Sequence, residues 1–380
     1  MSVFTSQAAV LVLSPILVMI ATDLDVSTAV AGQLRIVAAP LAALVAVLLT
    51  RFGGAFSLRT ILVAGAGLVA AGSLVSACAH TFFALALGQL PLWIGVALLV
   101  AGGIGAAGAW TAPDDRVRVA ARALAGAPAA WVVGMPLIGV VADVSWRLAF
   151  VAVPLPAALV TMALLAAARP AEQRRRSASL PALLRKHGAG SWVFGEFLVM
   201  SAWAGTLVFS GALFIETYGT SPRVTGLALA TVAVAYLGGN TLASRIREKC
   251  QLTRALPRAN VGAALAIAAT WIVTPNLFVT LALFALASLI VGARTVIGTS
   301  YGFALAGDRN LEVGSARAAF THLGYLVGSV IGGAALAAGG RPTTGIVFGL
   351  LVLAAAIPYR RTWSARCVAE AEPAVLLTPA

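Results

Sequence analysis

The sequence predicts an all-α membrane protein whose twelve transmembrane helices form two pseudo-symmetric six-helix bundles. Two observations lead to this fold class. Of the 380 residues, 60% are hydrophobic and only 10% are charged, whereas soluble domains carry about a quarter charged residues. The chain also contains an internal repeat at a nearly constant offset. The first observation places most of the chain in lipid, and the second divides it into two similar halves.

Apolar stretches of about 20 residues, long enough to cross about 30 Å of hydrocarbon as helix, recur along the chain. In lipid every backbone N–H and C=O group needs a partner inside the protein, which leaves helices or a closed barrel. The long runs without alternation exclude the barrel. The expected spans are 4–22, 30–50, 60–79, 83–108, 122–142, 147–168, 191–214, 224–244, 257–275, 277–305, 315–338 and 342–360.

Four anchors repeat at an offset of 193 to 195 residues, which is more than chance provides. Parallel repeats of whole helical bundles are typical of secondary transporters. The repeated anchors are 32–51 with 226–245, 115–116 with 308–309, 122–125 with 317–320, and Gly134 with Gly328.

The repeat predicts the domain organisation. We expect an N-terminal bundle over 1–168 and a C-terminal bundle over 191–363, joined by a basic cytoplasmic linker over 169–190. The linker is expected to be a solvated segment attracted to anionic headgroups rather than a regulatory site. Residues 364–380 are expected to form a short cytoplasmic tail.

The formal net charge of +13 reports topology rather than nucleic-acid binding. With the N-terminus inside, 21 of the 26 Lys and Arg residues fall in segments on the same side of the membrane. This is the positive-inside rule, and it places both termini in the cytoplasm. The charge is not gathered into a patch, so no nucleic-acid partner is expected.

Two motifs carry a resemblance to a known family. Segment 134–139 has the sequence Gly-Met-Pro-Leu-Ile-Gly, and segment 145–150 has Ser-Trp-Arg-Leu-Ala-Phe. They resemble the G-x-P-x-x-G and G-W-R-x-x-F signature of bacterial drug–proton antiporters in the major facilitator superfamily, the branch that includes arabinose and sugar efflux permeases. Span eleven is similar to the G-x-x-x-G-x-x-x-G-G helix of that branch. The resemblance covers nearly the whole chain and implies export rather than import.

The glycines and the proline of these motifs also have a physical role. Small residues four apart let helix backbones approach closely in lipid, where no hydrophobic force drives association. Proline removes one backbone hydrogen bond and permits a bend. We expect packing, including a sliding or rocking contact between bundles, from Gly134, Pro136, Gly139, Gly324, Gly328 and Gly332.

The chain departs from the branch at two places. In the loop after span two, the branch has an acid that helps to close the cytoplasmic gate, but this chain has Thr50 followed by Arg51. The span-four arginine associated with proton coupling is absent, and Gln89 lies near its place. These departures leave the strength of gating and the coupling ion open.

Ionisable side chains inside a span are costly unless they face a cavity or a partner, so each is a functional candidate. Glu196, the only acid placed inside a span, is the leading candidate for proton coupling; the alternative is an acid that neutralises the nearby basic loop. Arg294 could hold an anionic substrate group or pair with Glu196. His322 titrates near neutrality and is a second candidate for proton coupling, although a lone histidine among apolar residues is more often hydrogen-bonded within the bundle. Arg35 is a cavity candidate, but contact with lipid headgroups is favoured.

Trp131 and Trp203 lie mid-span, away from the interfacial belt. They are candidates for lining a substrate cavity, because aromatic faces suit flat or cationic substrates. Contact with lipid or with a neighbouring helix is the alternative. Gln89 and Asn240 could donate hydrogen bonds to the substrate, although interhelical bonding is the more common role.

The sequence gives no reason to expect an enzyme. Segment 103–108 matches G-x-G-x-x-G, but it follows no strand and lies inside span four, so it cannot cradle a phosphate. The sequence contains no Walker pattern, metal-ligand cluster or nucleophile–base pair, and its three cysteines are too scattered for a disulfide framework. We therefore expect no cofactor, no metal and no ATP drive.

These features favour a secondary transporter in the inner membrane of a bacterium. It would export a small amphipathic molecule (a drug, a metabolite or a sugar-like compound) by alternating access, with protons moving in exchange, and so contribute to multidrug resistance. The alternatives are a sugar or nucleoside facilitator or importer, and a transport-inactive membrane scaffold. The expected partners are the substrate, protons and membrane lipid, and the chain is expected to be a monomer.

Overall fold

The computed structural model describes residues 1–34, 40–42, 44–45, 48–49, 56–110, 126–167, 183–243, 249–306 and 310–357. Every regular element within these ranges is helical. Three of the predicted site residues, Arg35, Thr50 and Arg51, lie outside the described residues, as do positions 169–182 of the linker and the whole tail.

The helices follow the expected spans closely. The first half of the chain contains α1 (Ser2–Leu11), α2 (Leu13–Asp23), α3 (Thr28–Gly32), α5 (Leu58–Ala77), α6 (Phe82–Ala109), α8 (Gly126–Ala129), a π-helical turn (Ala130–Gly134), α9 (Met135–Ala142), α10 (Trp146–Ala152) and α11 (Pro154–Ala167). The second half contains α13 (Ala189–Tyr218), α14 (Pro222–Ala243), α15 (Lys249–Ile272), α16 (Leu277–Ala306) and α17 (Asn310–Ala354).

Most of the predicted spans can be recognised among the described residues. Nine helical segments there are long and apolar enough to cross a membrane, and Gly126–Ala142 is a shorter apolar segment. The last of the nine lies in α17, which is two helices joined at a kink, because Gly339 and Gly340 leave the helical conformation and Gly340 has φ +67°. The described residues therefore account for eleven spans. The remaining expected span, 30–50, lies largely outside them.

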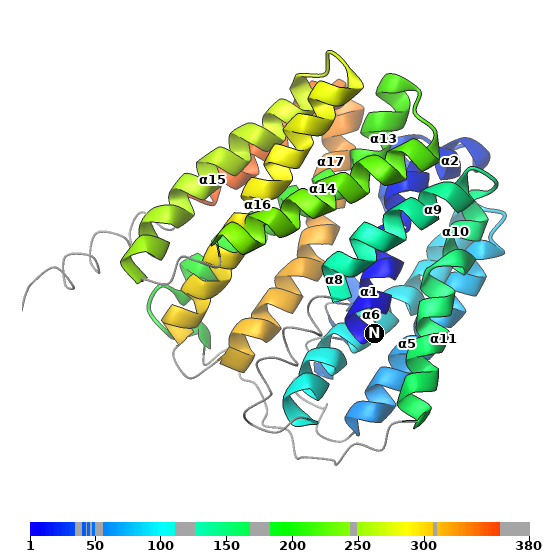
Figure 1. Cartoon of the computed structure of the whole chain (residues 1–380), viewed down its shortest axis with the longest axis horizontal. Coiled ribbons are helices and arrows are strands. Elements are labelled where there is room, and N and C mark those ends of the chain that lie inside the picture. The colour runs from blue at the N-terminus through cyan, green and yellow to red at the C-terminus, as the bar shows by residue number, and fades with distance from the viewer. Residues whose placement is uncertain are drawn as a thin grey trace, which may run out of the picture.

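The helices form two groups that lie side by side (Figure 1). In the first group, α5 packs against α6 and α11, and α1 packs against α6. In the second group, α17 packs against α13 and α15, and α16 packs against α14 and α15. We call these groups the N-terminal bundle (α1 to α11) and the C-terminal bundle (α13 to α17).

The two bundles meet mainly through α9 with α14, α2 with α13, and α3 with α17. The contact between α9 and α14 is a direct backbone contact at glycines. A Cβ atom on Gly139 would lie 2.5 Å from the carbonyl oxygen of Pro222 and 3.2 Å from Cα of Gly226. A Cβ atom on Gly226 would in turn lie 2.5 Å from the carbonyl oxygen of Met135. Gly139 of the predicted motif is therefore a contact between bundles.

Polar contacts join the bundles near the same end of the molecule. Asp143 Oδ1, beyond α9, accepts a hydrogen bond from the backbone N–H of Arg223 at 3.2 Å. Thr28 of α3 donates a hydrogen bond to Glu216 of α13. We call the end of the molecule that carries Asp143, Glu216 and Arg223 the joined end.

The glycines of span eleven pack within the C-terminal bundle. A Cβ atom on Gly324 would lie 2.9 Å from the backbone carbon of Met200, and one on Gly328 would lie 2.6 Å from the backbone nitrogen of Gly205. Gly332 approaches the ring of Phe348, at 2.7 Å from its Cβ position. These glycines let α17 lie directly on α13, which is a packing role.

The structure differs from the predicted boundaries at the start of α15. The sequence places the beginning of this span at residue 257, whereas the helix begins at Lys249 and contains Pro257 in its interior. The added turns contain Lys249, Gln251 and Arg254 and are polar. Hydropathy locates the part of a helix that crosses hydrocarbon, and a helix can continue past that part into water.

The contact at Gly139 generates a stability prediction with a matched control in the same helix. We expect Gly139→Ala to lower the free energy of unfolding by about 1–3 kcal/mol, because the new methyl group meets backbone atoms that cannot turn aside. Gly134→Ala should be nearly neutral, because the nearest atom to its Cβ position is 3.7 Å away. Thermal unfolding of the purified proteins in detergent measures both. Equal midpoints for the two variants would contradict the direct contact.

Candidate functional site

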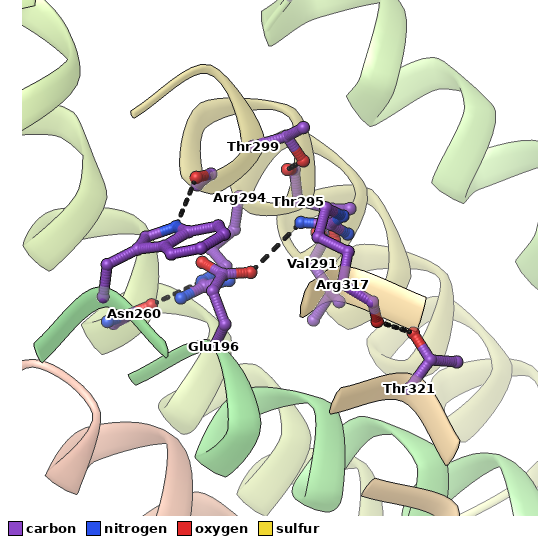
Figure 2. A network of polar contacts seen from close by, with 10 residues as sticks. Glu196, Asn260, Val291, Arg294, Thr295, Thr299, Arg317 and Thr321 are labelled. Carbon is purple, nitrogen blue, oxygen red and sulfur yellow. Dashed lines mark hydrogen bonds and ion pairs between the residues drawn. The ribbon is translucent and has the colours of Figure 1, made fainter. Parts of the chain in front are cut away.

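A cluster of charged side chains lies inside the C-terminal bundle. Arg294 Nη1 of α16 lies 2.6 Å from Glu196 Oε1 of α13. Arg317 Nη1 of α17 lies 3.2 Å from the other carboxylate oxygen, Oε2. Figure 2 shows Glu196 pointing toward Arg317, with Arg294 and Asn260 beside it. The structure therefore brings together Glu196 and Arg294, which the sequence suggests as a pair, and adds a second arginine.

Neighbouring groups hold the cluster in place. Arg294 Nε donates a hydrogen bond to Asn260 Oδ1 of α15 at 2.8 Å. Trp192 Nε1 donates to the backbone carbonyl of Gly298 at 2.8 Å, one turn along α16 from Arg294. Gly298 is necessary for this arrangement, because a Cβ atom there would collide with the Glu196 carboxylate. Helices α13, α15, α16 and α17 thus each contribute a side chain to the cluster.

Burial differs sharply within the cluster. The side chains of Glu196 and Arg294 are each 1% exposed, whereas that of Arg317 is 22% exposed. Removing an ionised group from water costs several kcal/mol unless partners compensate it. Glu196 has compensation from two arginines, so these three side chains carry one net positive charge. Arg317 is the partner with access to the surroundings, and Arg294 is the fixed one.

The carboxylate of the charged cluster has a neutral counterpart in the N-terminal bundle. Glu196 corresponds to Ser2 at the repeat offset of 194, and Gly298 corresponds to Gly103 at 195. A Cβ atom on Gly103 would collide with the Ser2 hydroxyl, as one on Gly298 would collide with the Glu196 carboxylate. The two bundles therefore repeat the same helix contact, with a hydroxyl in one and a carboxylate in the other.

A second cluster is aromatic and lies between the bundles. The ring of Tyr236 in α14 stacks on Trp203 of α13, with centroids 6.2 Å apart and an interplanar angle of 16°. It also stacks on Trp131 of the N-terminal bundle, at 6.4 Å and 27°. Trp131 lies in the π-helical turn that precedes α9 and donates a hydrogen bond to Gln7 Oε1 at 3.3 Å. The structure therefore joins both predicted tryptophans through Tyr236.

His322 lies in a third cluster, also between the bundles. Its ring meets Trp93 of α6 edge to face, with centroids 6.1 Å apart. Trp93 packs in the same way on Tyr325, at 5.8 Å. His322 is 3% exposed, and among the described residues its Nδ1 atom has no hydrogen-bond partner. His322 is therefore a contact of α17 with the N-terminal bundle.

The two predicted amide side chains lie apart from these clusters. Gln89 is fully buried and donates a hydrogen bond to Ser76 on the neighbouring helix α5 at 3.1 Å. This is the interhelical bonding that the sequence offers as the more common role. Asn240 lies near the end of α14, and its Oδ1 atom has no hydrogen-bond partner among the described residues.

Several residues of the site are missing from the sequence prediction. Arg317, Asn260, Tyr236 and Trp93 are not among the predicted site residues. Each lies inside an expected span, so the rule that polar or mid-span aromatic groups are candidates applies to all four. In the sequence, Arg317 is one of the charges that indicate topology, and Asn260 lies in an apolar stretch. Which of them meet is decided by the packing of several helices, and no local pattern records that.

The shared carboxylate leads to a prediction about stability. Glu196→Gln leaves two arginines without a counter-charge and should cost about 3–5 kcal/mol. Arg317→Gln should cost less, because the buried pair between Glu196 and Arg294 survives. The double variant should lose less than the sum of the two single variants. Thermal unfolding in detergent tests this ordering, and a Glu196→Gln protein as stable as Arg317→Gln would refute it.

A family model identifies the family, and solved structures share the fold. Residues 1–215 match the family model described as Major Facilitator Superfamily. A bacterial homolog to the human lysosomal transporter Spinster, in an inward-facing and unoccupied conformation, is similar with a TM-score of 0.79 at 16% sequence identity, over 100% of this chain and 96% of that chain. A D-xylose–proton symporter is similar with a TM-score of 0.71 at 17% identity, over 94% of each chain.

No curated protein sequence gives a significant match. The identities to the solved structures are low, so these structures establish the fold alone, while the family match extends over more than half of the chain. This chain therefore belongs to the major facilitator superfamily, and it is a multi-pass membrane carrier for secondary transport rather than an enzyme.

Proposed function

We propose that this carrier exports a small amphipathic molecule by alternating access and that protons move inward in exchange. The observation that carries the proposal is the aromatic stack of Trp131, Tyr236 and Trp203, in which both bundles meet. In carriers of this architecture the substrate lies between the halves, near the middle of the membrane. Aromatic faces between the bundles are suited to an amphipathic substrate.

The depth of the stack supports this proposal. Tyr236 lies 14 residues after Pro222, at the start of α14, which is about 21 Å along the helix. Trp131 lies 11 residues before Ala142, at the end of α9, or about 16 Å. The value for Trp131 is close to the middle of a hydrocarbon layer of about 30 Å, at about 15 Å, and the value for Tyr236 lies about 6 Å beyond the middle.

Glu196 supplies a route for coupling to protons. A proton on its carboxylate would end both ion pairs at once and remove the attraction that holds Arg317 of α17 to α13. Helix α17 also carries His322, which touches the N-terminal bundle at Trp93. Loss of charge at Glu196 would therefore loosen a helix that contacts the opposite bundle. This link between a titratable group and the bundle interface is what proton coupling requires.

The orientation and the direction of transport are part of the proposal. The positive-inside rule puts both termini, the linker over 169–190 and the tail over 364–380 in the cytoplasm of a bacterium. The joined end then faces outward, and the described conformation is closed on that side. The Spinster homolog with the same fold was solved in an inward-facing conformation. Export itself follows from the resemblance of segment 134–139 to the antiporter motif.

A second candidate is a facilitator or importer of a sugar or nucleoside that needs no proton gradient. One observation favours it: both carboxylate oxygens of Glu196 are held by arginines, so the acid already has a structural role in joining α13, α16 and α17. The D-xylose–proton symporter with the same fold carries a sugar together with protons, so it favours a sugar as the substrate but not the absence of coupling. Counterflow exchange of labelled substrate without a pH gradient would identify this candidate.

The proposal predicts the result of an efflux assay. Energised inverted vesicles that contain the protein should accumulate at least one member of a panel of neutral, anionic and cationic amphipathic dyes. An uncoupler should collapse the accumulation, and Glu196→Gln should abolish it while membrane insertion persists. Asp25→Asn is the control, because it removes an exposed acid in the turn between α2 and α3. Accumulation that resists the uncoupler would refute proton exchange and leave the facilitator.

A further inference from the structure

The three rings of the aromatic stack differ in their attachment. Trp203 is 3% exposed and belongs to α13, whereas Trp131 and Tyr236 are partly exposed. Tyr236 and Trp203 lie on the same bundle, and Trp131 lies on the other. Any movement that rocks the bundles apart keeps the Trp203–Tyr236 pair and breaks the Trp131–Tyr236 pair. Trp203 therefore covers one face of the Tyr236 ring whether or not the bundles separate, whereas Trp131 covers the other face only while the bundles are together.

The backbone of Tyr236 is held rigidly. Gly292 of α16 approaches it so closely that a Cβ atom there would lie 3.2 Å from the Tyr236 Cα atom. One turn further, a Cβ atom on Gly239 would lie 2.8 Å from the backbone nitrogen of Ala293. A ring whose backbone is fixed by such close helix contacts is a preorganised surface.

Trp131 is seated differently. Its hydrogen bond goes to Gln7 of its own bundle, so it keeps that partner when it separates from Tyr236. It lies in a π-helical turn, a geometry found frequently at functional sites. Gly134, at the end of the turn, has no tight contact at its Cβ position, where the nearest atom is Val153 Cγ1 of its own bundle at 3.7 Å. Trp131 can therefore leave Tyr236 as part of its bundle without losing its own polar contact.

We propose that Tyr236 is the platform for a flat aromatic ring of the substrate, and that Trp131 occupies the place of that ring in the described conformation. The proposal rests on the function proposed above and names the substrate class, which is compounds with a planar aromatic group. Opening of the bundles uncovers one face of Tyr236, and a substrate ring replaces Trp131 on it. An aromatic pair is favourable beyond the apolar area that it buries, which a saturated molecule of the same size cannot match.

The test compares a planar ligand with a saturated ligand of the same skeleton. Equilibrium dialysis with labelled naphthol and its fully hydrogenated counterpart measures binding to the purified full chain, without any need for transport. Naphthol should bind about tenfold more tightly, the upper end of what one aromatic pair contributes. Tyr236→Phe should keep this preference and Tyr236→Leu should remove it. Tyr218→Leu, which changes a tyrosine near the joined end, is the control.

The Trp131→Leu variant tests whether Trp131 competes with the ligand for the Tyr236 ring or instead helps to bind the ligand. Because Trp131 occupies the place of the ligand, its removal should leave naphthol binding unchanged or tighter. A loss as large as that of Tyr236→Leu would overturn the role of Trp131. A preference for naphthol that survives Tyr236→Leu, or that is absent from the unaltered chain, would overturn the platform.

Folding and transport are controlled separately. Thermal unfolding of each variant identifies any that fails to fold. If a Tyr236 variant does not fold, the affinity of Trp131→Leu for naphthol still tests the proposal. Naphthol binding with the expected pattern, together with no dye efflux in vesicles, would support the platform and refute export. Dye efflux without any preference for naphthol in the binding assay would support export and refute the platform.

Discussion

Helix backbones in this molecule touch one another directly, and they do so at glycines. In lipid no hydrophobic force drives helices together, so their association depends on close packing and on polar contacts. Gly139 and Gly226 bring α9 and α14 together across the bundle interface, and Gly328 lets α17 lie on α13. A glycine also leaves space for the charged cluster, because the Glu196 carboxylate occupies the space that a side chain at position 298 would take. Without these contacts neither the interface nor the charged cluster could form.

The buried charged groups and the buried ring contacts lie in different parts of the molecule. The charged cluster is enclosed by four helices of one bundle, and its most exposed member is Arg317. The aromatic stack and the His322 contact instead lie where the bundles meet. The charges of the buried cluster are thus kept within one bundle, whereas the contacts of Tyr236 with Trp131 and of His322 with Trp93 join the two bundles through rings. Breaking an aromatic pair costs far less than separating a buried ion pair, so this arrangement suits an interface that opens repeatedly.

The sequence predicts the fold well, because hydropathy and the internal repeat report directly on helices that cross a membrane. It selects Glu196, Arg294, His322, Trp131 and Trp203 for a sound physical reason, since a polar or large aromatic group in mid-span needs an explanation. It does not show that Tyr236 lies between the two tryptophans, because that contact unites three helices from both bundles. Gln89 shows the converse: the sequence marks it as polar and buried, but its partner Ser76 is on the adjacent helix and makes it a structural residue. The start of α15 is missed because polar residues continue a helix outside the hydrocarbon.

The equivalence of Ser2 and Glu196 has a consequence for the way the two halves have diverged since the duplication. Both copies inherited the same glycine-lined recess, but only the later copy filled it with an acid. The buried acid is therefore confined to one half of the molecule, and the other half keeps the same helix contact with a neutral hydroxyl. A duplicated carrier can in this way retain a symmetric frame while its two copies come to differ in charge.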